Sequence, residues 1–533
     1  MGKLLAVGIS ANCRNYTVFY YDRATMVTEW LVFLLSWIAF YAFYIRWTRR
    51  KQYDAARGME GPKAYPLIGA GYKFLGKSTP EQLHQVLTEI TSTYRSPAAV
   101  WLGQNLCLFL HKPEHAQAVL KSNDMLNRAN FHRYFNVNKG ILTQPAHTWK
   151  AHRKMLNLCF SPSILKGFMP TINQKSQVFV EQLAGWVGKP EQNIYLEVGK
   201  WALDTISATV LGLDYHLQKT DAAVAYLKNI DEYLTLVTKR MATAHQHPDL
   251  LYIMTRDFRD FARTGKQFYS FSSMVMDSKK DFINPEVMAD FKENPRKPRI
   301  FIDMVYQMAA ADPDHLADED IRDHLDEVIF AGHDAIATTM AYIMLMMAMH
   351  PEVQERVHQE VMSVCPDEGA EFSLEDCNKL TYTEMVCKET MRLFPVGPII
   401  GRRATADVRL DENHIIPQNA QCIISFYQLH RDPEVWGPNA DRFDPENFLP
   451  EKADQRHPYS FLPFSAGSRN CLGYRYAWLP VKIMLAYLAR SYRLKTSLTM
   501  DQLTLQNYGI IILRIAQGCQ VTVEQREGSK LGR

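Results

Sequence analysis

The 533-residue chain lacks the features that mark several large classes of protein. Its net charge of +3 is mild, and no arginine-rich run alternates with aromatic residues, which excludes a nucleic-acid-binding surface. Its nine cysteines are scattered without a CxxC pair, as is usual in a reducing, cytosol-facing setting. No cluster of closely spaced cysteine and histidine residues occurs, which excludes a structural zinc site.

The chain also lacks internal repeats, low-complexity segments and any linker that interrupts residues 60–525. Its hydrophobic content of 47% and charged content of 22% are those of a packed globular protein. We therefore expect one large, mainly α-helical domain with small β-sheets. Helical periodicity covers 149–160, 171–187, 319–350, 351–364 and 381–394, and β-favouring stretches cover 99–110, 421–426 and 510–515.

An uncharged, aromatic-rich run extends from Trp30 to Ile45. It is slightly shorter than the roughly 20 residues that span a bilayer, and the flanking aromatic residues make up the length. Four basic residues follow directly, which keeps the bulk of the protein in the cytosol: Arg46, Arg49, Arg50 and Lys51. No small-x-small cleavage site follows, so a retained signal anchor is favoured over a cleaved signal peptide.

We divide the chain accordingly into a leader (1–29), a transmembrane signal anchor (30–47), a basic and Pro/Gly-rich linker (48–69) and a catalytic domain (70–533). The first 25 residues are polar, contain the sequon Asn15-Tyr16-Thr17, and look like neither a signal nor a domain. Met26 opens a sequence typical of an anchor, so we expect translation to begin there. Recovery of residues 3–14 from native protein by peptide mapping would contradict this.

The strongest chemical signal is the segment FLPFSAGSRNCLG, from Phe461 to Gly473. This turn-rich loop leads into a helical stretch that starts near Cys471. Amide groups at a helix end and nearby positive charge both favour a thiolate, which is the form that binds iron. Gly467 and Gly473 allow close approach by a flat macrocycle. A lone cysteine is ordinarily an inert core residue, but this surrounding pattern indicates a ligand.

The segment resembles the FxxGxRxCxG haem signature of the cytochromes P450. Trp149 and Arg153 are similar to the family's WxxxR motif, an i, i+4 pair on one helix face. Glu389 and Arg392 are similar to its ExxR motif, whose ion pair steadies the cysteine loop. The resemblance covers about residues 30–525 and implies the cytochrome P450 fold, haem b as cofactor and Cys471 as the axial ligand of the haem iron.

The same resemblance implies how the haem is held. Arg402 looks like the family arginine on an inner strand. With Arg153 and Arg469, it is expected to bind the two haem propionates through charge-assisted hydrogen bonds. Phe464 resembles the aromatic residue that packs against the thiolate and sets its electron donation.

Two departures from the family pattern place the chain more narrowly. Asn447 stands where the FxPERF segment commonly has its arginine, so a neutral amide must join the Glu-Arg pair through ordinary hydrogen bonds. This variant, together with His430-Arg431-Asp432-Pro433, resembles the microsomal family 4 branch and especially its insect members. Ala331 replaces a glutamate that esterifies haem in many family 4 members. We therefore expect the haem to be extractable by acidic organic solvent, and haem retained on the polypeptide would contradict this.

The central helix carries the residues expected to deliver protons. Gly332 permits a local distortion that admits oxygen and water, and Asp334 is the candidate proton relay. His333 is a second candidate for shuttling protons, although a solvated or structural histidine is the simpler interpretation. Ala335 replaces the threonine whose hydroxyl guides protons in most monooxygenases of the family. Thr339 lies one turn further along with a similar facing, whereas Thr338 faces further away.

The resemblance implies an oxidoreductase, specifically a monooxygenase that inserts one oxygen atom from O2 into an apolar fatty acid, hormone or xenobiotic. The chain has no GxGxxG or flavin module, so electrons must arrive from another protein, and the resemblance implies NADPH as their source. The implied partner is NADPH-cytochrome P450 reductase, with cytochrome b5 as a further candidate donor, at the endoplasmic reticulum (microsomal) membrane.

Two other functions stay open: a haem-thiolate isomerase or dehydratase of peroxides, and a haem protein that has lost catalysis. NADPH consumption with reductase separates the monooxygenase from both, and turnover of a fatty acid hydroperoxide separates the two alternatives. The substrate itself cannot be identified from the sequence. Pocket residues are expected from five segments: 125–140, 215–275, 325–340, 396–401 and 507–512.

Overall fold

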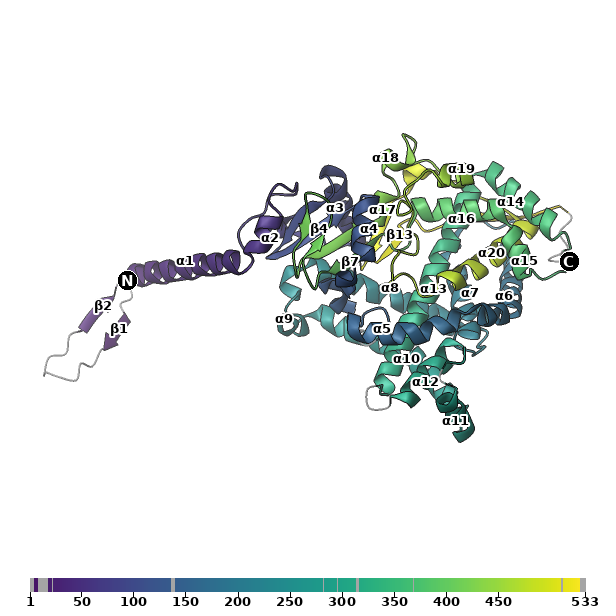
Figure 1. Ribbon diagram of the computed structural model, residues 1–533, viewed down its shortest axis with the longest axis horizontal. Helices are drawn as coiled ribbons and strands as arrows, with labels where there is room; N and C mark the ends of the chain where they lie inside the picture. The colour runs from purple at the N-terminus through teal and green to yellow at the C-terminus, as the bar shows by residue number, and fades with distance from the viewer. Residues whose placement is uncertain are drawn as a thin grey trace.

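A long exposed helix precedes a mainly helical body in the computed structural model (Figure 1). The structure describes residues 4–7, 18–21, 23–135, 140–280, 282–294, 296–312, 316–367, 369–509 and 511–527. The sequon at Asn15, part of the pocket segment 125–140 and the first residue of the predicted strand 510–515 lie outside these residues. Strands β1 (Leu4–Val7) and β2 (Val18–Tyr21) pair in an antiparallel hairpin before the helix.

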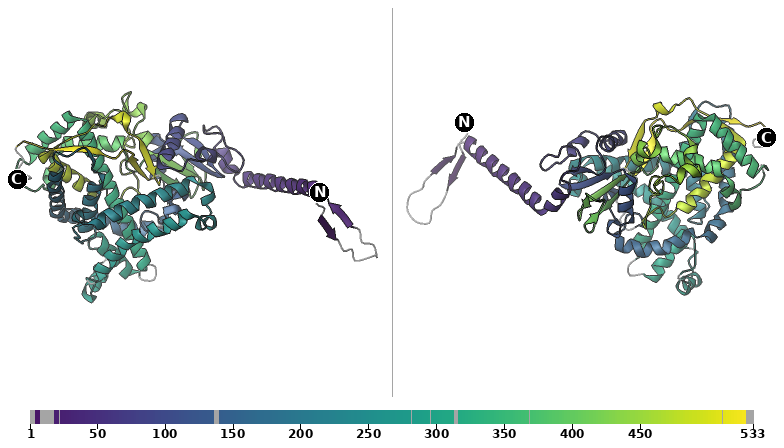
Figure 2. Two further views of the ribbon diagram at one scale, coloured as in Figure 1. Left: turned by 180° about the vertical axis from the view of Figure 1, so that it is seen from behind. Right: turned by 45° about the horizontal axis from the view of Figure 1, so that its top comes forward.

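Helix α1 (Arg23–Thr48) contains the predicted anchor and projects from the body in both views of Figure 2. Its 26 residues extend about 39 Å at 1.5 Å each, enough to cross a hydrocarbon core of about 30 Å. Most of its apolar side chains are exposed, with Trp30 at 70%, whereas Ile45 near its end is buried. Two described helices are long and apolar enough to span a membrane, and the other, α13 (Asp318–Met349), is mostly buried as a core helix. The start at Met26 stays a prediction.

A five-stranded sheet lies at the end of the body that α1 joins (Figure 1). Its order is β3 (Ala98–Leu102), β4 (Asn105–Leu110), β10 (Gln421–Ser425), β7 (Ile399–Arg403) and β5 (Asn127–Arg128). Strand β10 pairs with β4 in parallel and with β7 antiparallel, which joins the two ends of the domain. The register places Arg128 directly opposite Arg402.

The helical core is built around α13. It packs against α7 (Tyr195–Thr209), while α6 (Pro162–Leu183) packs against α20 (Tyr474–Ser491). Both pairs belong to one continuous apolar core. The predicted helices at 319–350, 351–364 and 381–394 correspond to α13, α14 (Pro351–Val364) and α16 (Thr381–Leu393). The predicted helix at 149–160 becomes α5 (Ala146–Leu156) followed by a 3-10 turn.

The predicted start of the helix at 171–187 was wrong. The helix α6 begins at Pro162 and runs through Pro170, which the sequence suggested as a boundary. Proline fits the first helical turn because its missing N–H has no intrahelical partner there. At Pro170 one backbone hydrogen bond is lost, but the adjacent Met169 and Ile172 are buried in the core, so tertiary packing holds the helix together.

The other elements complete the body around this core. The remaining helices are α2 (Arg50–Ala55), α3 (Pro80–Thr93), α4 (Pro113–Lys121), α8 (Asp221–Ala242), α9 (Asp249–Ile253), α10 (Arg256–Lys280), α11 (Pro285–Glu293), α12 (Phe301–Ala311), α15 (Leu374–Lys379), α17 (Phe426–Leu429), α18 (Pro433–Trp436) and α19 (Pro450–Ala453). In the small sheets, β14 (Gln520–Gln525) pairs with both β11 (Tyr492–Lys495) and β6 (Gln192–Asn193), β12 (Leu505–Tyr508) pairs with β13 (Ile512–Ile515), and β8 (Val408–Arg409) pairs with β9 (Ile415–Ile416).

Candidate functional site

A cavity of about 360 Å³ lies between α13, β7 and the loop that precedes α20. Four of the five expected pocket segments line it, and the fifth, 215–275, lines a smaller adjoining cavity through residues such as Tyr233 and Phe268. Ile206 of α7 also lines the main cavity, which no sequence pattern predicted. The lining is largely apolar, and Cys471 forms part of one wall.

Cys471 differs from the other described cysteines, because it is exposed to the cavity while the other seven are buried. Its backbone N–H donates to the Phe464 carbonyl at 3.0 Å, and α20 begins three residues later with Gly473 at its N-cap. Burial within the protein raises the pKa of the Cys471 thiol, although the Gly473 N–H and the Arg153 charge oppose the rise. Both groups act in the direction that the sequence analysis expects, although burial has the larger effect on the pKa. A coordinating metal deprotonates such a thiol outright.

The surroundings of the two glycines of the loop, Gly467 and Gly473, differ in whether they would admit a side chain. Gly467 has a φ of +74°, and a Cβ there would lie 1.9 Å from the Leu120 carbonyl oxygen. A neighbouring backbone, not a bound group, explains this glycine. At Gly473 no atom lies within 4 Å of the position a Cβ would take. Phe464 lines the cavity and makes an edge contact with Trp478 of α20, with ring centroids 5.9 Å apart.

Three arginines gather beside the cavity: Arg128 and Arg469 line it, and Arg402 lies on β7 directly opposite Arg128. Arg402 is 1% exposed, and its guanidinium donates to the backbone carbonyls of Gly401 and Arg469. Arg469 donates to three backbone carbonyls, including that of Gln144 at 2.7 Å, and its Nε has no hydrogen-bond partner. The Arg469 guanidinium also lies 5.0 Å from the Trp149 ring centroid, which places the WxxxR tryptophan behind it.

Arg128 of β5 is the third member, and the sequence analysis missed it. Its Nε donates to the Leu142 carbonyl at 2.9 Å. Burial, followed by the charges of neighbouring arginines, lowers the pKa of Arg402 well below its usual range. The same causes lower the pKa of Arg469 to about 9. Burial lowers the pKa of Arg128 to about 10, with Glu327 opposing the change.

This arginine cluster fits the carboxylates of a haem. In the described ranges, Arg402 and Arg469 bond to backbone carbonyls and to no carboxylate. Buried cations without anions are strongly unfavourable. Anionic groups from a ligand would therefore stabilise this cluster. Two propionates at this edge, with Cys471 in another wall of the same cavity, match the donor set of a haem-thiolate site.

Arg153 serves the cysteine loop directly. Its guanidinium donates to the backbone carbonyl of Asn470 and to the Asn470 side chain, both at 2.7 Å, and to Asn157 at 2.9 Å. These bonds tie α5 to the residue that immediately precedes Cys471. The structure thus adds a loop-holding contact to the propionate contact that the motif predicts for Arg153.

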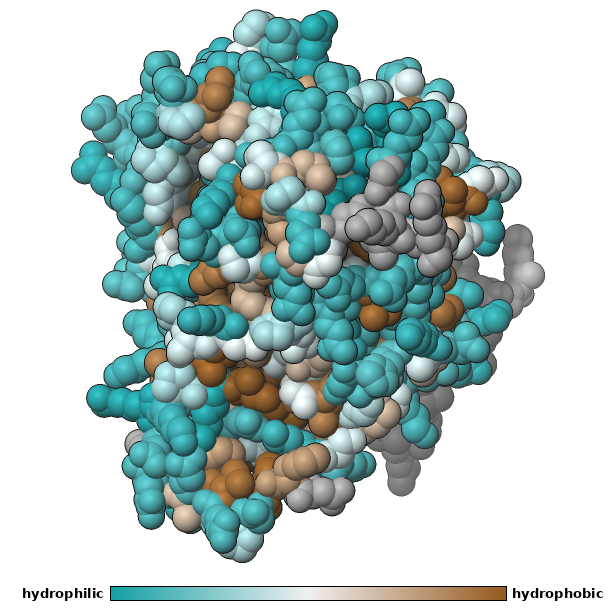
Figure 3. All heavy atoms as spheres, turned by 90° about the vertical axis from the view of Figure 1, so that its right-hand side faces the viewer, coloured by the Kyte–Doolittle hydropathy of each residue, from teal (hydrophilic) through white to brown (hydrophobic). Residues whose placement is uncertain are grey.

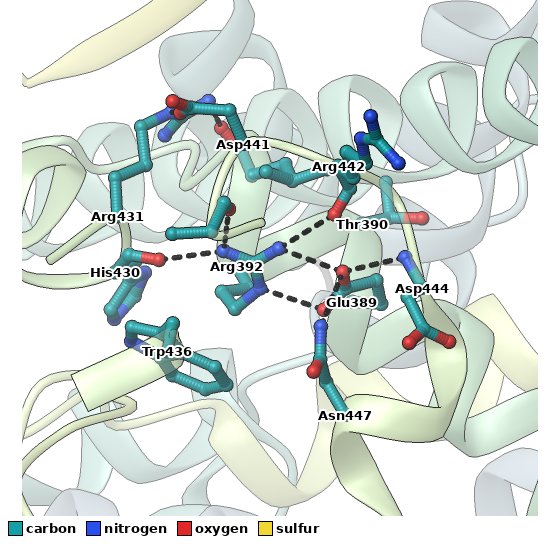
Figure 4. Close-up of polar contacts among 12 residues, drawn as sticks. Glu389, Thr390, Arg392, His430, Arg431, Trp436, Asp441, Arg442, Asp444 and Asn447 are labelled. Carbon is teal, nitrogen blue, oxygen red and sulfur yellow. Dashed lines mark hydrogen bonds and ion pairs between the residues drawn. The ribbon is translucent and has the colours of Figure 1, made fainter. Parts of the chain in front are cut away.

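The Glu389–Arg392 pair is fully buried and bidentate, with N–O distances of 2.7 and 2.8 Å (Figure 4). The remaining Arg392 donors bind the backbone carbonyls of His430, Ala440 and Arg442. The pair therefore organises the segment after β10. In these contacts Arg392 does not touch the cysteine loop itself.

His430 supplies the connection between that pair and the loop. Its Nε2 accepts a hydrogen bond from the Leu462 N–H at 2.8 Å, while its carbonyl accepts one from Arg392. Burial and the neighbouring arginines lower the pKa of His430 to about 3, so the ring is neutral and can accept this bond. The ion pair thus steadies the loop through His430.

Asn447 makes the contact that its neutral amide allows. Its Nδ2 donates to Glu389 Oε1 at 3.1 Å, and Figure 4 shows the amide pointing at the carboxylate. Arg456 donates to the Asn447 backbone carbonyl at 2.6 Å, and its guanidinium lies 4.2 Å from the Trp436 ring centroid. The Glu389 charge acts on Arg456, so a second cation is present near the pair even though position 447 is neutral.

The central helix presents Ala331, Ala335 and Thr339 to the cavity. Gly332 lies against α7, because a Cβ there would meet the Ile206 side chain at 2.1 Å. The structure therefore gives Gly332 a packing role in an unbroken helix. Thr338 is buried on another face, 3.5 Å from the Tyr195 hydroxyl, and His333 is buried with its Nδ1 against the Ile329 carbonyl.

Asp334 borders the cavity and is 2% exposed. Its Oδ1 accepts from the Tyr195 hydroxyl at 2.9 Å and from Arg514 Nη2 at 2.6 Å, whereas its Oδ2 has no hydrogen-bond partner. Arg514 also pairs with Asp231, whose side chain is half-exposed. A chain of ion pairs thus joins the cavity wall to the protein surface.

Comparison with known proteins agrees with this geometry. The Cytochrome P450 family profile matches residues 59–523. The chain belongs to the cytochrome P450 family. It is 29% identical to Probable cytochrome P450 313b1 of Drosophila melanogaster, over 94% of this chain and 99% of that protein. It is 31% identical to Cytochrome P450 4F2 of Homo sapiens over 86% and 90%, and 30% identical to Cytochrome P450 4c21 of Blattella germanica over 87% and 92%.

This cytochrome P450 is accordingly a haem-thiolate monooxygenase, an oxidoreductase with a small-molecule substrate and an external redox partner. Its relatives confirm the family 4 and insect resemblance. Sequence reasoning missed Arg128, and it used His430 only as part of the HRDP segment, without its role in holding the cysteine loop. The LNRANF and HRDP segments around them are the places where a signal could have been sought.

Proposed function

We propose that this cytochrome P450 is a microsomal enzyme that inserts one oxygen atom from O2 into an apolar substrate. Electrons would come from NADPH through NADPH-cytochrome P450 reductase, with cytochrome b5 as a second donor. The observation that carries the proposal is the largely apolar cavity with Cys471 in one wall and with Arg128 and Arg469, beside the buried Arg402, at its edge. When bound, the haem supplies the oxidising chemistry.

Each residue of the site has a part in this proposal. Cys471 ligates the iron, while Arg402, Arg469 and the additional Arg128 hold the propionates. Arg153 and His430 fix the cysteine loop through the hydrogen bonds described above. The apolar lining excludes water, which strengthens the electrostatic interactions in the cavity. Phe464 packs at the base of the loop.

Asp334 is the proposed carrier of protons. Tyr195 and Arg514 hold one of its oxygens, and the other oxygen is free to exchange a proton at the cavity wall. The half-exposed Asp231 would connect this group to solvent through Arg514. At position 335 no hydroxyl is present to pass the proton on, so an ordered water or a hydroxyl of the substrate must do so.

The proposed location is the endoplasmic reticulum membrane, with a single N-terminal anchor and a cytosolic catalytic domain. Helix α1 provides the span, and α9 lies on the side of the body that α1 joins (Figure 1). The α9 region exposes four large apolar side chains: Leu250, Leu251, Ile253 and Met254. The face turned away from α1 is mainly hydrophilic (Figure 3), as expected of a cytosol-facing surface.

The decisive experiment reconstitutes the purified protein with reductase and scores a panel of apolar compounds by the low-spin to high-spin Soret shift. We expect NADPH consumption and an oxygenated product for compounds that give the shift. Cys471→Ser should abolish the thiolate-type Soret band of the reduced carbon monoxide complex. A surviving band would move the ligand elsewhere.

Position 335 favours one competing function. An isomerase or dehydratase of peroxides does not need protons delivered to O2, so its activity would not depend on a hydroxyl at position 335. Turnover of a fatty acid hydroperoxide without reductase, together with no NADPH-dependent product, would establish that function instead. Absence of both activities in haem-loaded protein would indicate lost catalysis.

A further inference from the structure

Helix α1 carries a row of aromatic side chains along one face, which we name the aromatic seam. Its members follow one another at spacings of three and four residues in alternation: Trp30, Phe33, Trp37, Phe40, Tyr44 and Trp47. The first four rings make edge contacts in sequence, with centroids 6.1, 6.1 and 6.2 Å apart. All six residues are at least half-exposed. The seam is therefore a continuous aromatic surface on the outside of α1.

The spacing of the seam is the heptad repeat of a coiled coil, in which the first and fourth positions meet a partner helix. A repeat of about 3.5 residues keeps one face toward a partner when two helices wind around each other in a left-handed supercoil. A helix surrounded by lipid on every side has no need of this repeat. The pattern therefore indicates that a second helix lies along the seam.

The opposite side of α1 is aliphatic. At 3.6 residues per turn, four residues lie across the helix from the seam: Leu31, Leu35, Ile38 and Ala42. Ile45, which is buried, also lies outside the seam. Helix α1 projects from the body in both views of Figure 2, so the catalytic domain does not cover the seam. Another helix can therefore reach it while α1 is joined to the body.

The centre of the seam suits a protein partner better than lipid. Trp37 lies at the middle of the candidate span Met26–Thr48. Tryptophan and tyrosine residues of membrane proteins are enriched at the two membrane surfaces, where their polar atoms meet water. In the hydrocarbon core, lipid tails offer no acceptor for the indole N–H. An aromatic ring on a facing helix can accept it through an N–H···π contact.

We infer that the aromatic seam pairs α1 with α1 of a second copy of this chain, side by side and parallel in the membrane. The inference rests on the proposed location, because it requires α1 to span the bilayer. The basic residues that follow the apolar run orient every copy the same way. Two copies therefore align in register, and each Trp37 meets the Trp37 of the other copy.

The area of the seam is sufficient for such a pair. Aromatic side chains bury about 150 to 250 Å² each, so six rings offer roughly 900 to 1,500 Å² per helix. A standard protein interface buries about 800 Å² per partner. Two identical seams are self-complementary, as a two-fold symmetric interface requires. The seam is uncharged, so it has no electrostatic feature that would select a different partner.

The test measures energy transfer between donor-labelled and acceptor-labelled full-length protein in phosphatidylcholine vesicles. We expect transfer that persists when the protein is diluted into excess lipid and that unlabelled wild-type protein competes away. The seam variant moves two rings to the aliphatic side at nearly constant composition: Leu35→Trp, Trp37→Leu, Ile38→Phe and Phe40→Leu. It should raise the dissociation constant in the membrane at least about tenfold, or about 1.4 kcal/mol.

Tyr41→Leu with Phe43→Leu is the matched control, because it removes two rings of α1 that lie outside the seam. Energy transfer in this control should stay close to that of the wild type. Trp37→Leu with Phe40→Leu, which keeps α1 apolar, decides the question if the rearranged helix fails to insert. Resistance to extraction by alkaline carbonate is measured on every protein to establish insertion.

Equal transfer in the wild type and in the inserted seam variants, or no transfer in the wild type, overturns the inference. Transfer that requires added sterol or added reductase also overturns it, because the seam would then hold a sterol or the anchor of the reductase. Failure of the proposed location has a different signature: alkaline carbonate extracts the wild-type protein from the vesicles.

Discussion

The residue at position 335 determines how protons can pass from Asp334 to the cavity. Ala335 borders the cavity, while the hydroxyl of Thr339 lies one helical turn away, about 6 Å along the axis. Thr338 faces Tyr195 and α7. Neither threonine replaces a hydroxyl at 335, so the carboxylate of Asp334 needs an intermediary.

Ala335→Thr should reduce the peroxide released per NADPH consumed when the substrate has no hydroxyl. The new hydroxyl would pass protons from Asp334, and a tenfold change in partition needs only about 1.4 kcal/mol between competing barriers. Thr339→Ala is the matched control for adding or removing a hydroxyl elsewhere on this wall. Unchanged coupling in a folded, haem-loaded Ala335→Thr enzyme would show that proton delivery does not depend on position 335.

At the scale of elements, the cysteine loop depends on contacts from three separate segments. Helix α5 holds it through Arg153, α16 holds the segment after β10 through Arg392, and His430 of that segment binds Leu462. Part of the loop's rigidity therefore depends on the buried ion pair at Glu389, which acts through His430. This explains physically why a motif far away in sequence affects the iron ligand.

Glu389→Ala or Arg392→Ala should sharply lower haem incorporation, because an uncompensated buried charge costs roughly 3 to 5 kcal/mol. His430→Phe should have a milder effect, about 1 to 3 kcal/mol, because it leaves the Leu462 N–H unsatisfied while keeping an aromatic ring. Haem content per protein and thermal unfolding measure both effects. Normal values in all three variants would refute this account of the loop.

Arg456 should matter more here than at an ordinary surface position. Arg456→Met removes the cation near Glu389. We expect the free energy of unfolding to fall by about 1 kcal/mol or more, and haem content to fall with it. Adding Asn447→Arg to that variant should restore much of the loss, and the double-mutant cycle measures the coupling. Lys452→Met, an exposed cation on α19, is the control. Additive effects would argue against compensation.

For the molecule as a whole, the exposed apolar residues are concentrated on α1 and near α9. Such exposure is unfavourable in water and is typical of surfaces that meet a membrane or a partner. We interpret the end of the body next to α1 as the membrane-facing end. The catalytic domain would then rest on the bilayer as well as being tethered to it.

Removal of residues 1–47 should release the protein from membranes only in part. Burying one large apolar side chain contributes about 1.5 to 3 kcal/mol, so adding Leu250→Ser and Met254→Ser should lower vesicle binding by at least about tenfold. Flotation with vesicles of microsomal composition measures this. Leu374→Ser, at an exposed apolar residue of α15 far from α1 in Figure 1, is the matched control. Equal losses in both variants would remove the α9 contact.

The sequence by itself determined the features that depend on local spacing. The haem signature, the WxxxR and ExxR pairs, the apolar run at 30–45 and most helices of the core were predictable, because residues three or four apart share a helix face and a motif lies within one segment. The family assignment followed from the order of these motifs.

Tertiary structure decided which residues complete those motifs. Arg128 joins Arg402 only because β5 pairs with β7, and Glu327 reaches both cavities only because α13 passes between them. Packing against the core also allows α6 to continue past Pro170, and the fold places Arg456 near Glu389. The physical reason is that a buried charge or a cavity wall is defined by every segment that surrounds it, and these segments come together only in the folded chain.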